Sequence, residues 1–322
     1  MAILSVDLAF RSWSELGVVI LRRATREEST SNAAAQVECE IVPMSAPGLD
    51  PAIDRGPHGQ LLGREMANAR PGKKRADRMA KKQNADGNLL ASKPQNSSAS
   101  EPRPLPATEE QGPIDAEILA GRLNHLCAIR NIHILMLDGP QAWKSGSSRQ
   151  EYARDCELQL NTTAKTGLPG LVQPPPYRSF AEFCMDVYDA LGRRGWHRFE
   201  TSHAPLDGEA KERMLVESNP QAAWEALGLQ PLPAKHEARI SDLAQAYAAL
   251  QSVAPFTCNR PPNHGQLQAI VAGLPGLALE THDTASVRIV GKPPCREEGH
   301  WREGFIVLPL PPARHSSLRW LN

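Results

Sequence analysis

Residues 3–8 have the sequence ILSVDL, an apolar run that Ser5 and Asp7 interrupt. Its shortness and its branched residues predict a buried β-strand. A second apolar run lies at 18–21, and residues 37–42 (VECEIV) alternate apolar and polar side chains, as a half-exposed strand does. The chain is therefore expected to begin with two antiparallel strands followed by an edge strand.

Helices and strands are predicted to alternate after residue 112. Apolar residues recur at helical spacing in 114–127, 180–191, 240–250 and 267–274, and short strands are expected at 132–137, 214–216 and 305–308. Asn219 and Pro220 form a typical helix start, and Gly228 is placed to end that helix. This order predicts an α/β domain around a mixed sheet.

A long segment interrupts this pattern. Residues 44–112 are rich in Pro, Gly, Ser, Asn and Ala, and they contain the basic run GKKRADRMAKK. Such a composition buries too little apolar surface to offset its ordering entropy, which predicts a disordered insertion. Residues 22–36 are expected to form a smaller flexible loop. The predicted organisation is N-terminal strands in 1–43, the insertion in 44–112, the rest of the domain in 113–310 and a C-terminal tail in 311–322.

The composition excludes few classes of function. Lys plus Arg and Asp plus Glu both number 36, so the net charge of zero argues neither for nor against nucleic acid. The six cysteines form no CxxC pair, which favours reduced cysteines over a zinc site or disulfide framework. Charged residues interrupt the apolar N-terminus, unlike a signal peptide, and no apolar run reaches the length of a membrane span. A cytoplasmic protein without a membrane segment is expected.

Three acidic residues are the candidates for chemistry. Asp7 lies inside an apolar strand, where a charge needs a partner, while Asp138 and Glu217 each end a predicted strand. If these strands are neighbours, the three carboxylates meet and suit Mg²⁺ or Mn²⁺, ions that support phosphodiester cleavage. The alternative is that each carboxylate caps a turn or helix.

Seven segments together resemble the family called domain of unknown function 429, whose members are described as predicted RNase H-like nucleases. The segments are LSVDLAFRSWSELGVVIL at 4–21, LDGPQAWK at 137–144, RDCELQLNTTAKTGLPG at 154–170, FAEFCMDVYDALGRRGW at 180–196, VESNPQAAWEALGLQPLPAK at 216–235, HGQLQAIVAGLPGLAL at 264–279 and WREGFIVLP at 301–309. They cover nearly all of the chain outside the insertion.

The resemblance implies an RNase H-like fold with helices on both faces of the sheet. It implies metal-dependent phosphodiester hydrolysis, with nucleic acid as a partner. The active site of that fold has an acid on the first strand and another after the fourth, which Asp7 and Asp138 match. Glu217 corresponds to the acid before the proline of its segment. Asp7, Asp138 and Glu217 are thus expected to bind Mg²⁺ or Mn²⁺ and to be catalytic.

The start of the last helix departs from the family pattern. The pattern reads THDELQA, but here it is NHGQLQA, so Gly265 and Gln266 replace two acids. The carboxylate expected on the final helix is therefore missing, which predicts weakened or absent catalysis. His264 is retained as a candidate catalytic residue, and a polar helix cap is its alternative role.

Candidate substrate-binding residues come from two matched segments. The loop expected as PGKTG occurs here within NTTAKTG, which keeps Lys165 and Thr166 for contact with phosphate. Lys144 ends the segment LDGPQAWK and joins them as a candidate.

Two other functions compete with a nuclease. One is a catalytically inactive module that binds nucleic acid or another partner, which the missing acid favours. The other is a relative of actin-like ATPases and sugar kinases, which share the core sheet and the first-strand Asp. That class needs a Gly/Thr-rich phosphate loop, and AFRSWSELG at 9–17 is poor in such residues.

Overall fold

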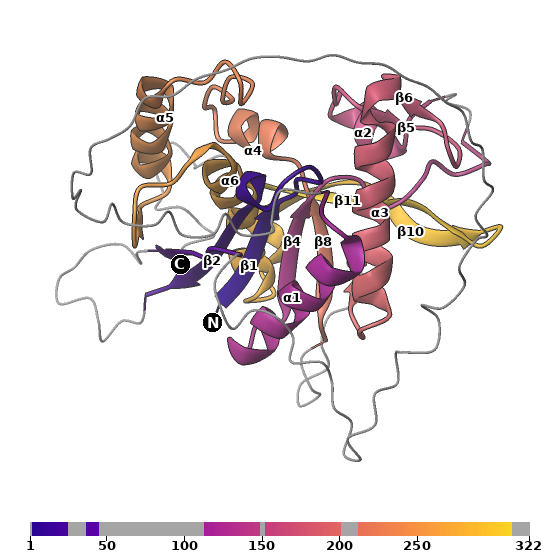
Figure 1. Ribbon diagram of the computed structural model, residues 1–322, viewed down its shortest axis with the longest axis horizontal. Helices are drawn as coiled ribbons and strands as arrows, with labels where there is room; N and C mark the ends of the chain where they lie inside the picture. The colour runs from indigo at the N-terminus through magenta and orange to yellow at the C-terminus, as the bar shows by residue number, and fades with distance from the viewer. Residues whose placement is uncertain (1, 25–36, 45–112, 149–151, 201–211, 311–322) are drawn as a thin grey trace, which may run out of the picture. The chain divides into compact units, whose positions relative to one another are not determined.

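Short apolar segments assemble into a mixed β-sheet with helices around it (Figure 1). The computed structural model of the protein describes residues 2–24, 37–44, 113–148, 152–200 and 212–310. The strands within these ranges are β1 (Ala2–Asp7), β2 (Gly17–Arg23), β3 (Val37–Ile41), β4 (Ile134–Asp138), β5 (Lys165–Thr166), β6 (Val172–Gln173), β7 (His197–Arg198), β8 (Met214–Ser218), β9 (Phe256–Cys258), β10 (Val287–Glu297) and β11 (His300–Pro309).

The main sheet combines an antiparallel meander with a parallel half. In the described part of the chain its strand order is β10-β11-β8-β4-β1-β2-β3-β9, with β7 also beside β8 and with β5 and β6 in a separate pair. β1, β2 and β3 are antiparallel neighbours, whereas β4 is parallel to β1, β8 to β4 and β11 to β8. The carboxyl ends of β1, β4 and β8 therefore lie at one edge of the sheet, where open α/β sheets bind ligands.

Helices cover both faces of the sheet. The α-helices are α1 (Ala116–Ile129), α2 (Asp155–Gln159), α3 (Arg178–Gly192), α4 (Pro220–Ala226), α5 (Ile240–Val253) and α6 (His264–Leu279), and single turns of 3₁₀-helix span Trp13–Glu15, Pro175–Tyr177 and Thr284–Ser286. Because side chains alternate along β1, Leu4 and Val6 join the apolar cluster under α1 and α3, while Ile3 joins the cluster under α4, α5 and α6. The protein is thus an α/β protein with a mixed sheet between two helical layers.

Small residues let α6 lie very close to the sheet. A Cβ built on Gly17 would lie 2.0 Å from the carbonyl oxygen of Gly265, and one on Gly273 would lie 2.7 Å from Cβ of Ser5. Real Cβ atoms do not approach so closely, so these positions require glycine for space. The first turn of α6 is thereby held against the ends of β1 and β2, beside Asp7.

The predicted elements are confirmed with three differences. β3 is not an edge strand, because β9 pairs with it in parallel. β2 continues to Arg23, two residues into the segment 22–36 that was expected to be a loop. The last strand is longer than predicted and pairs with β10, which the pattern analysis missed because Pro293 and Pro294 argue against a strand. The ladder accommodates them with a register shift between Lys292 and Cys295.

Several expectations lie outside the described residues. The insertion is one, apart from the buried Met44, and so are residues 25–36 and the tail 311–322. Among the helices that the structure describes, none is both long and apolar enough to cross a lipid bilayer.

Candidate functional site

The strand register brings Asp7 and Asp138 together. Val6 of β1 is paired with Leu137 of β4, and each acid is the next residue of its strand. Since alternate side chains share a face, both carboxylates lie on the side of the sheet that α6 covers. Oδ2 of Asp7 lies only 2.9 Å from the place that a Cβ on Gly265 would occupy. The two acids thus form a pair between the strand ends and α6, hereafter the Asp7–Asp138 pair.

Burial and mutual repulsion favour the protonated form of this pair. Burial, followed by the charge of Asp138 and a hydrogen bond with it, raises the pKa of Asp7 well above its usual range, against the attraction of Lys235. Burial raises the pKa of Asp138 to about 7, the hydrogen bond from Asp7 opposes this rise, and the charge of Glu217 adds to it. The protonated form of the pair is therefore favoured, and a cation bound next to the two carboxylates would relieve the same repulsion.

Glu217 does not join the pair. Its register partner is Leu137, whereas Asp138 is opposite Ser218, so Glu217 projects to the other face of the sheet. Its carboxylate accepts hydrogen bonds of 2.6 and 2.7 Å from Nη2 and Nη1 of Arg154, and both side chains are buried. The backbone N–H of Gln141 donates to it as well, at 3.1 Å. The oxygens of Glu217 are thus already satisfied by a guanidinium and an amide.

The three acids expected to share an ion are therefore divided. Asp7 and Asp138 lie together, whereas Glu217 forms an ion pair with Arg154. In the described ranges, no group of three or more His, Cys, Asp and Glu side chains is arranged to hold a metal ion. The positions of the strand ends were predicted correctly. Glu217, however, is opposite Leu137 and not Asp138, and this difference of one residue in register places its side chain on the other face of the sheet.

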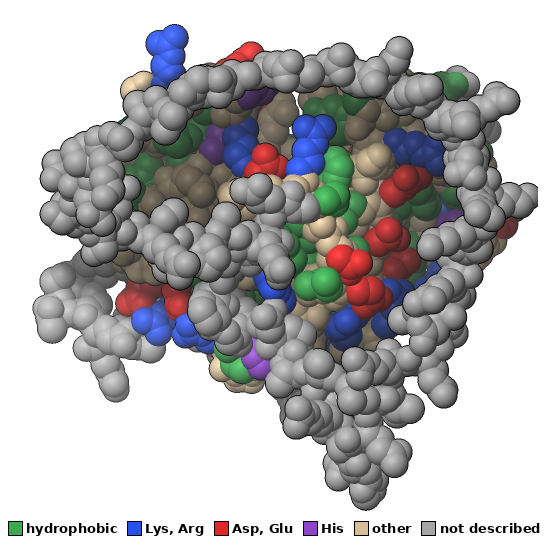
Figure 2. All heavy atoms as spheres, in the orientation of Figure 1, with side chains coloured by type: hydrophobic (Ala, Val, Ile, Leu, Met, Phe, Trp, Pro, Cys, Tyr) green, Lys and Arg blue, Asp and Glu red, His purple; other side chains and the backbone are tan. Residues whose placement is uncertain are grey.

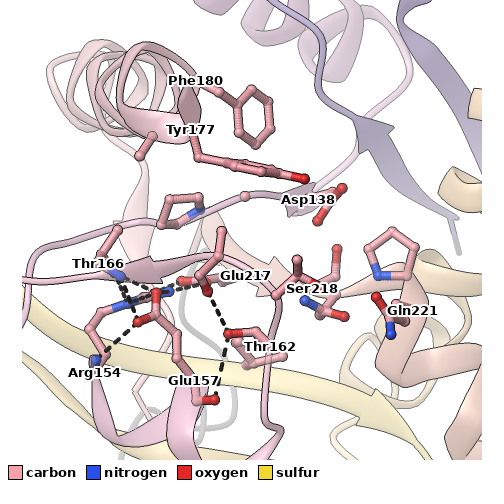
Figure 3. Close-up of a pocket in the computed structure, with 18 of the residues that line it drawn as sticks. Asp138, Arg154, Glu157, Thr162, Thr166, Tyr177, Phe180, Glu217, Ser218 and Gln221 are labelled. Carbon is pink, nitrogen blue, oxygen red and sulfur yellow. Dashed lines mark hydrogen bonds and ion pairs between the residues drawn. The ribbon is translucent and has the colours of Figure 1, made fainter. Parts of the chain in front are cut away.

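Arg154 is the centre of a buried polar network (Figure 3). Its Nε donates to Glu157 and to the hydroxyl of Thr166, at 3.0 Å each. Thr166 in turn donates its backbone N–H and its hydroxyl to Glu157. Thr166, a candidate for substrate binding, therefore has its hydroxyl occupied by this network, which joins α2 and β5 to the end of β8.

Two cavities open beside the acids. The first, of about 250 Å³, is lined by Asp138, Arg154 and Glu217 at its base and by Tyr177 and Phe180. Figure 3 shows the two aromatic side chains lying over Asp138, while Glu217 turns toward Arg154. One cavity thus contains an acid, an ion pair and an aromatic wall.

The second cavity is lined by Asp7 and by two basic side chains, Arg11 and Lys235. Its lining includes Asp7, Arg11, Lys235, His264 and Gln268, and it shares Gln268 and Phe180 with the first cavity. Arg11 and Lys235 are exposed. The shared lining residues make the two cavities neighbours beside the acid pair, and the second is lined by two cationic side chains, Arg11 and Lys235, together with Asp7 and Glu15.

The first two turns of α6 present His264 and Gln268 to the site. Nε2 of His264 is 2.9 Å from the carbonyl oxygen of Pro233, which only accepts, so Nε2 carries the hydrogen. Burial lowers the pKa of His264, which favours the neutral ring. Gln266 caps the helix through Asn263, and position 265 has no room for a side chain. A side chain at 265 would press on Asp7 and on the backbone of Glu15, with its Cβ 2.9 and 3.1 Å from the nearest oxygens.

Gln268 is the site residue that the sequence analysis missed. It lies one helical turn after His264 and borders both cavities. Its Oε1 accepts a 2.7 Å hydrogen bond from Nε1 of Trp224, which fixes the amide. The available signal was that Gln268 follows His264 by four residues on a helix capped by Asn263, which places both side chains on one face.

The two candidate lysines do not line either cavity. Lys144 is 4% exposed, and its ammonium donates to the carbonyl oxygens of Ser145 and Ser148. The ammonium of Lys165 donates to the carbonyl oxygen of Thr162. Both ammonium groups are thus held by backbone carbonyl oxygens, and their role in substrate binding stays a prediction.

No family model, no curated protein and no solved structure matches the chain. The function must therefore be inferred from the geometry of the site. That geometry consists of two adjacent carboxyl groups, exposed cationic side chains on one side and an aromatic wall on the other.

Proposed function

We propose that the protein is a divalent-metal-dependent phosphodiester hydrolase with an RNase H-like fold and a relative of the family called domain of unknown function 429. The observation that carries the proposal is the Asp7–Asp138 pair. The two acids end the first and the fourth strands of the chain, the positions that the resemblance implies. The antiparallel meander of β1, β2 and β3, continued by parallel β4 and β8, also supports an RNase H-like sheet.

The pair fits a hard cation, whereas Glu217 does not. Mg²⁺ is commonly held by one or two carboxylates, with water and substrate phosphate completing its coordination. Asp7 and Asp138 provide two adjacent carboxylates whose raised pKa values, caused by burial and by their mutual repulsion, are consistent with a site that a cation would stabilise. Glu217 already has that charge from Arg154. When bound, Mg²⁺ or Mn²⁺ supplies an activated water and stabilises charge on the phosphate oxygens.

The surrounding side chains suit an anionic substrate with a flat ring. Arg11 and Lys235 attract a phosphate to the cavity next to Asp7. Tyr177 and Phe180 provide a surface on which a base or sugar packs beside Asp138. Acidic and basic side chains are mixed on the face seen in Figure 2. Binding of a nucleic acid would therefore depend on the side chains that line the two cavities and not on a broad basic surface.

Metal-dependent cleavage is the direct test. Labelled RNA and DNA are incubated with the full chain and Mn²⁺, with and without EDTA, and Mn²⁺ binding is measured separately by calorimetry. Asp7→Asn and Asp138→Asn are expected to abolish both cleavage and Mn²⁺ binding. Asp115→Asn is the matched control, because Asp115 caps α1 away from the site and Asn caps equally well.

The variant Glu217→Gln tests whether the Arg154–Glu217 ion pair is needed for metal binding by the Asp7–Asp138 pair. This change is expected to lower the melting temperature, since it leaves the buried Arg154 with less compensation, while Mn²⁺ binding by the folded protein is retained. Cleavage that survives EDTA or Asp7→Asn contradicts the proposal.

A catalytically inactive nucleic-acid binding module is the second candidate. Two observations favour it: Arg154 neutralises Glu217, and the first turn of α6 carries no carboxylate. In that case the chain binds the labelled oligonucleotides, and no product forms with Mn²⁺.

A further inference from the structure

Two cysteines far apart in the sequence are register partners in the sheet. Cys39 of β3 lies opposite Cys258 of β9 in a parallel pair, and the backbone N–H of Asn259 donates to the carbonyl oxygen of Cys39. Register partners on parallel strands project to the same face. Neighbouring strands lie about 4.8 Å apart, within the range of roughly 4.4–6.8 Å between the Cα atoms of a disulfide. The backbone thus already has the spacing that a disulfide needs.

The two thiols differ in access. Cys39 is 3% exposed and belongs to the core, whereas Cys258 is partly exposed. This difference suits a pair in which Cys258 reacts first with a reagent from solvent and Cys39 acts from inside.

The surroundings of Cys258 favour its thiolate. Hydrogen bonds from the Cys39 thiol and from the Tyr247 hydroxyl lower the pKa of Cys258, against the effect of burial. Tyr247, from α5, packs edge-to-face on Phe256 of β9 with ring centroids 5.4 Å apart. Its oxygen accepts from Nε2 of Gln251 at 3.2 Å, which leaves its hydrogen free to donate.

The other four cysteines lack this arrangement. Cys127, Cys156 and Cys184 are buried without a cysteine opposite them, and burial raises the pKa of each thiol, as the hydrogen bond with Cys258 and burial do for Cys39. Cys295 is exposed on β10, where burial and nearby Glu297 raise its pKa. All six cysteines of the chain lie in the described residues, and only Cys39 and Cys258 are cross-strand partners.

We propose that Cys39 and Cys258 form a redox-active dithiol, which a small disulfide oxidises to a disulfide bridge between β3 and β9. The Cys258 thiolate attacks one sulfur of the small disulfide, so that a mixed disulfide forms and one small thiolate leaves. The Cys39 thiol then gives up its proton and attacks the sulfur of Cys258, releasing the second small thiol. One protein dithiol and one small disulfide thus yield one protein disulfide and two small thiols. This inference is independent of the proposed hydrolase function.

Glutathione disulfide is the probe for the test. The full chain is equilibrated with defined ratios of reduced to oxidised glutathione, free thiols are alkylated under denaturing conditions, and peptides are identified by mass spectrometry. The expected product has lost two of its six thiols and contains a Cys39–Cys258 peptide. Disulfides that join other cysteines, or six free thiols at every ratio, overturn the proposal.

Three variants assign the order of reaction. Cys39→Ser is expected to accumulate the glutathione adduct at Cys258, and Cys258→Ser is expected to lose both the adduct and the bridge. Cys295→Ser is the matched control, since it removes an exposed cysteine and is expected to form the bridge like the wild type. Circular dichroism confirms that each variant is folded. A folded Cys39→Ser protein without an adduct at Cys258 contradicts the assigned order and with it the proposal.

Discussion

At the scale of single residues, the decisive feature is that Asp7 and Asp138 lie next to each other while Glu217 is paired with Arg154. All three acids follow apolar strand residues, so their local sequences look alike. They differ in their partners, because Asp7 and Asp138 have each other and Glu217 has Arg154. A buried carboxylate beside an arginine has its charge partner within the protein, whereas two adjacent carboxylates repel each other and respond to a cation.

The pair makes the stability of the protein depend on pH. Folding raises the pKa of Asp138 from an ordinary value of 3.8 to about 7. A raised pKa stabilises the folded protein at low pH, and this contribution is lost as the pH rises through 7. Between pH 4 and 7, the free energy of unfolding of the wild type is expected to fall relative to that of Asp138→Asn by up to about 1.4 kcal/mol per pH unit.

Urea unfolding at a series of pH values measures this difference. Asp115→Asn serves again as the control and is expected to give no such divergence from the wild type, since Asp115 is a solvent-accessible helix cap. Parallel curves for the wild type and Asp138→Asn would show that Asp138 has no raised pKa.

Sequence reasoning identified Asp7 because a charge in an apolar strand needs a partner, and the structure places a partner carboxyl beside it. It did not identify the role of Arg154. That residue is far from Glu217 in the chain, and only the packing of α2 against the sheet brings them together. It also did not show that Lys144, a candidate for substrate binding, is buried with its ammonium against backbone carbonyl oxygens, because that depends on the folded loop around it.

At the scale of elements, local signals were sufficient where they were strong. Asn219 caps α4 through the N–H of Ala222, and Gly228 follows its end with φ of 73°, as the sequence predicts. The β10–β11 hairpin was missed because its prolines resemble a loop and its ladder is irregular. The close contact between α6 and β1 was also missed. It depends on glycines such as Gly273, and the sequence does not show which element packs against them.

This close contact predicts opposite effects for two helical glycines. Gly273→Ala in α6 places a Cβ 2.7 Å from Ser5 Cβ and 2.9 Å from Leu21 Cδ1, and overpacking of this kind costs about 1–3 kcal/mol. Gly192→Ala in α3 meets nothing within 4 Å and is expected to be neutral or stabilising by up to about 1 kcal/mol, because alanine favours helices. Thermal unfolding of both variants checks this, and equal melting temperatures would mean that α6 does not lie this close to the sheet.

At the scale of the whole molecule, the sheet edge that carries the acids is built from segments on both sides of the insertion. β1 comes before residues 45–112 and β4 after them, so the site depends on the two segments meeting. The described residues that flank the insertion are both anchored in the same apolar cluster. Met44 and Ile114 are 4% and 5% exposed, and Arg122 of α1 donates to the carbonyl oxygen of Met44.

These anchors predict that the domain folds without the insertion. In the shortened chain, a Gly/Ser linker of roughly twelve residues, which reaches at most about 40 Å, replaces residues 46–111. The melting temperature is expected to stay within a few degrees of that of the full chain, because loop-closure entropy changes only slowly with loop length. Mn²⁺ binding by the Asp7–Asp138 pair is expected to be retained. A shortened chain that is unfolded by circular dichroism would show that residues 46–111 belong to the fold, and one that is folded but binds no Mn²⁺ would place part of the site within them.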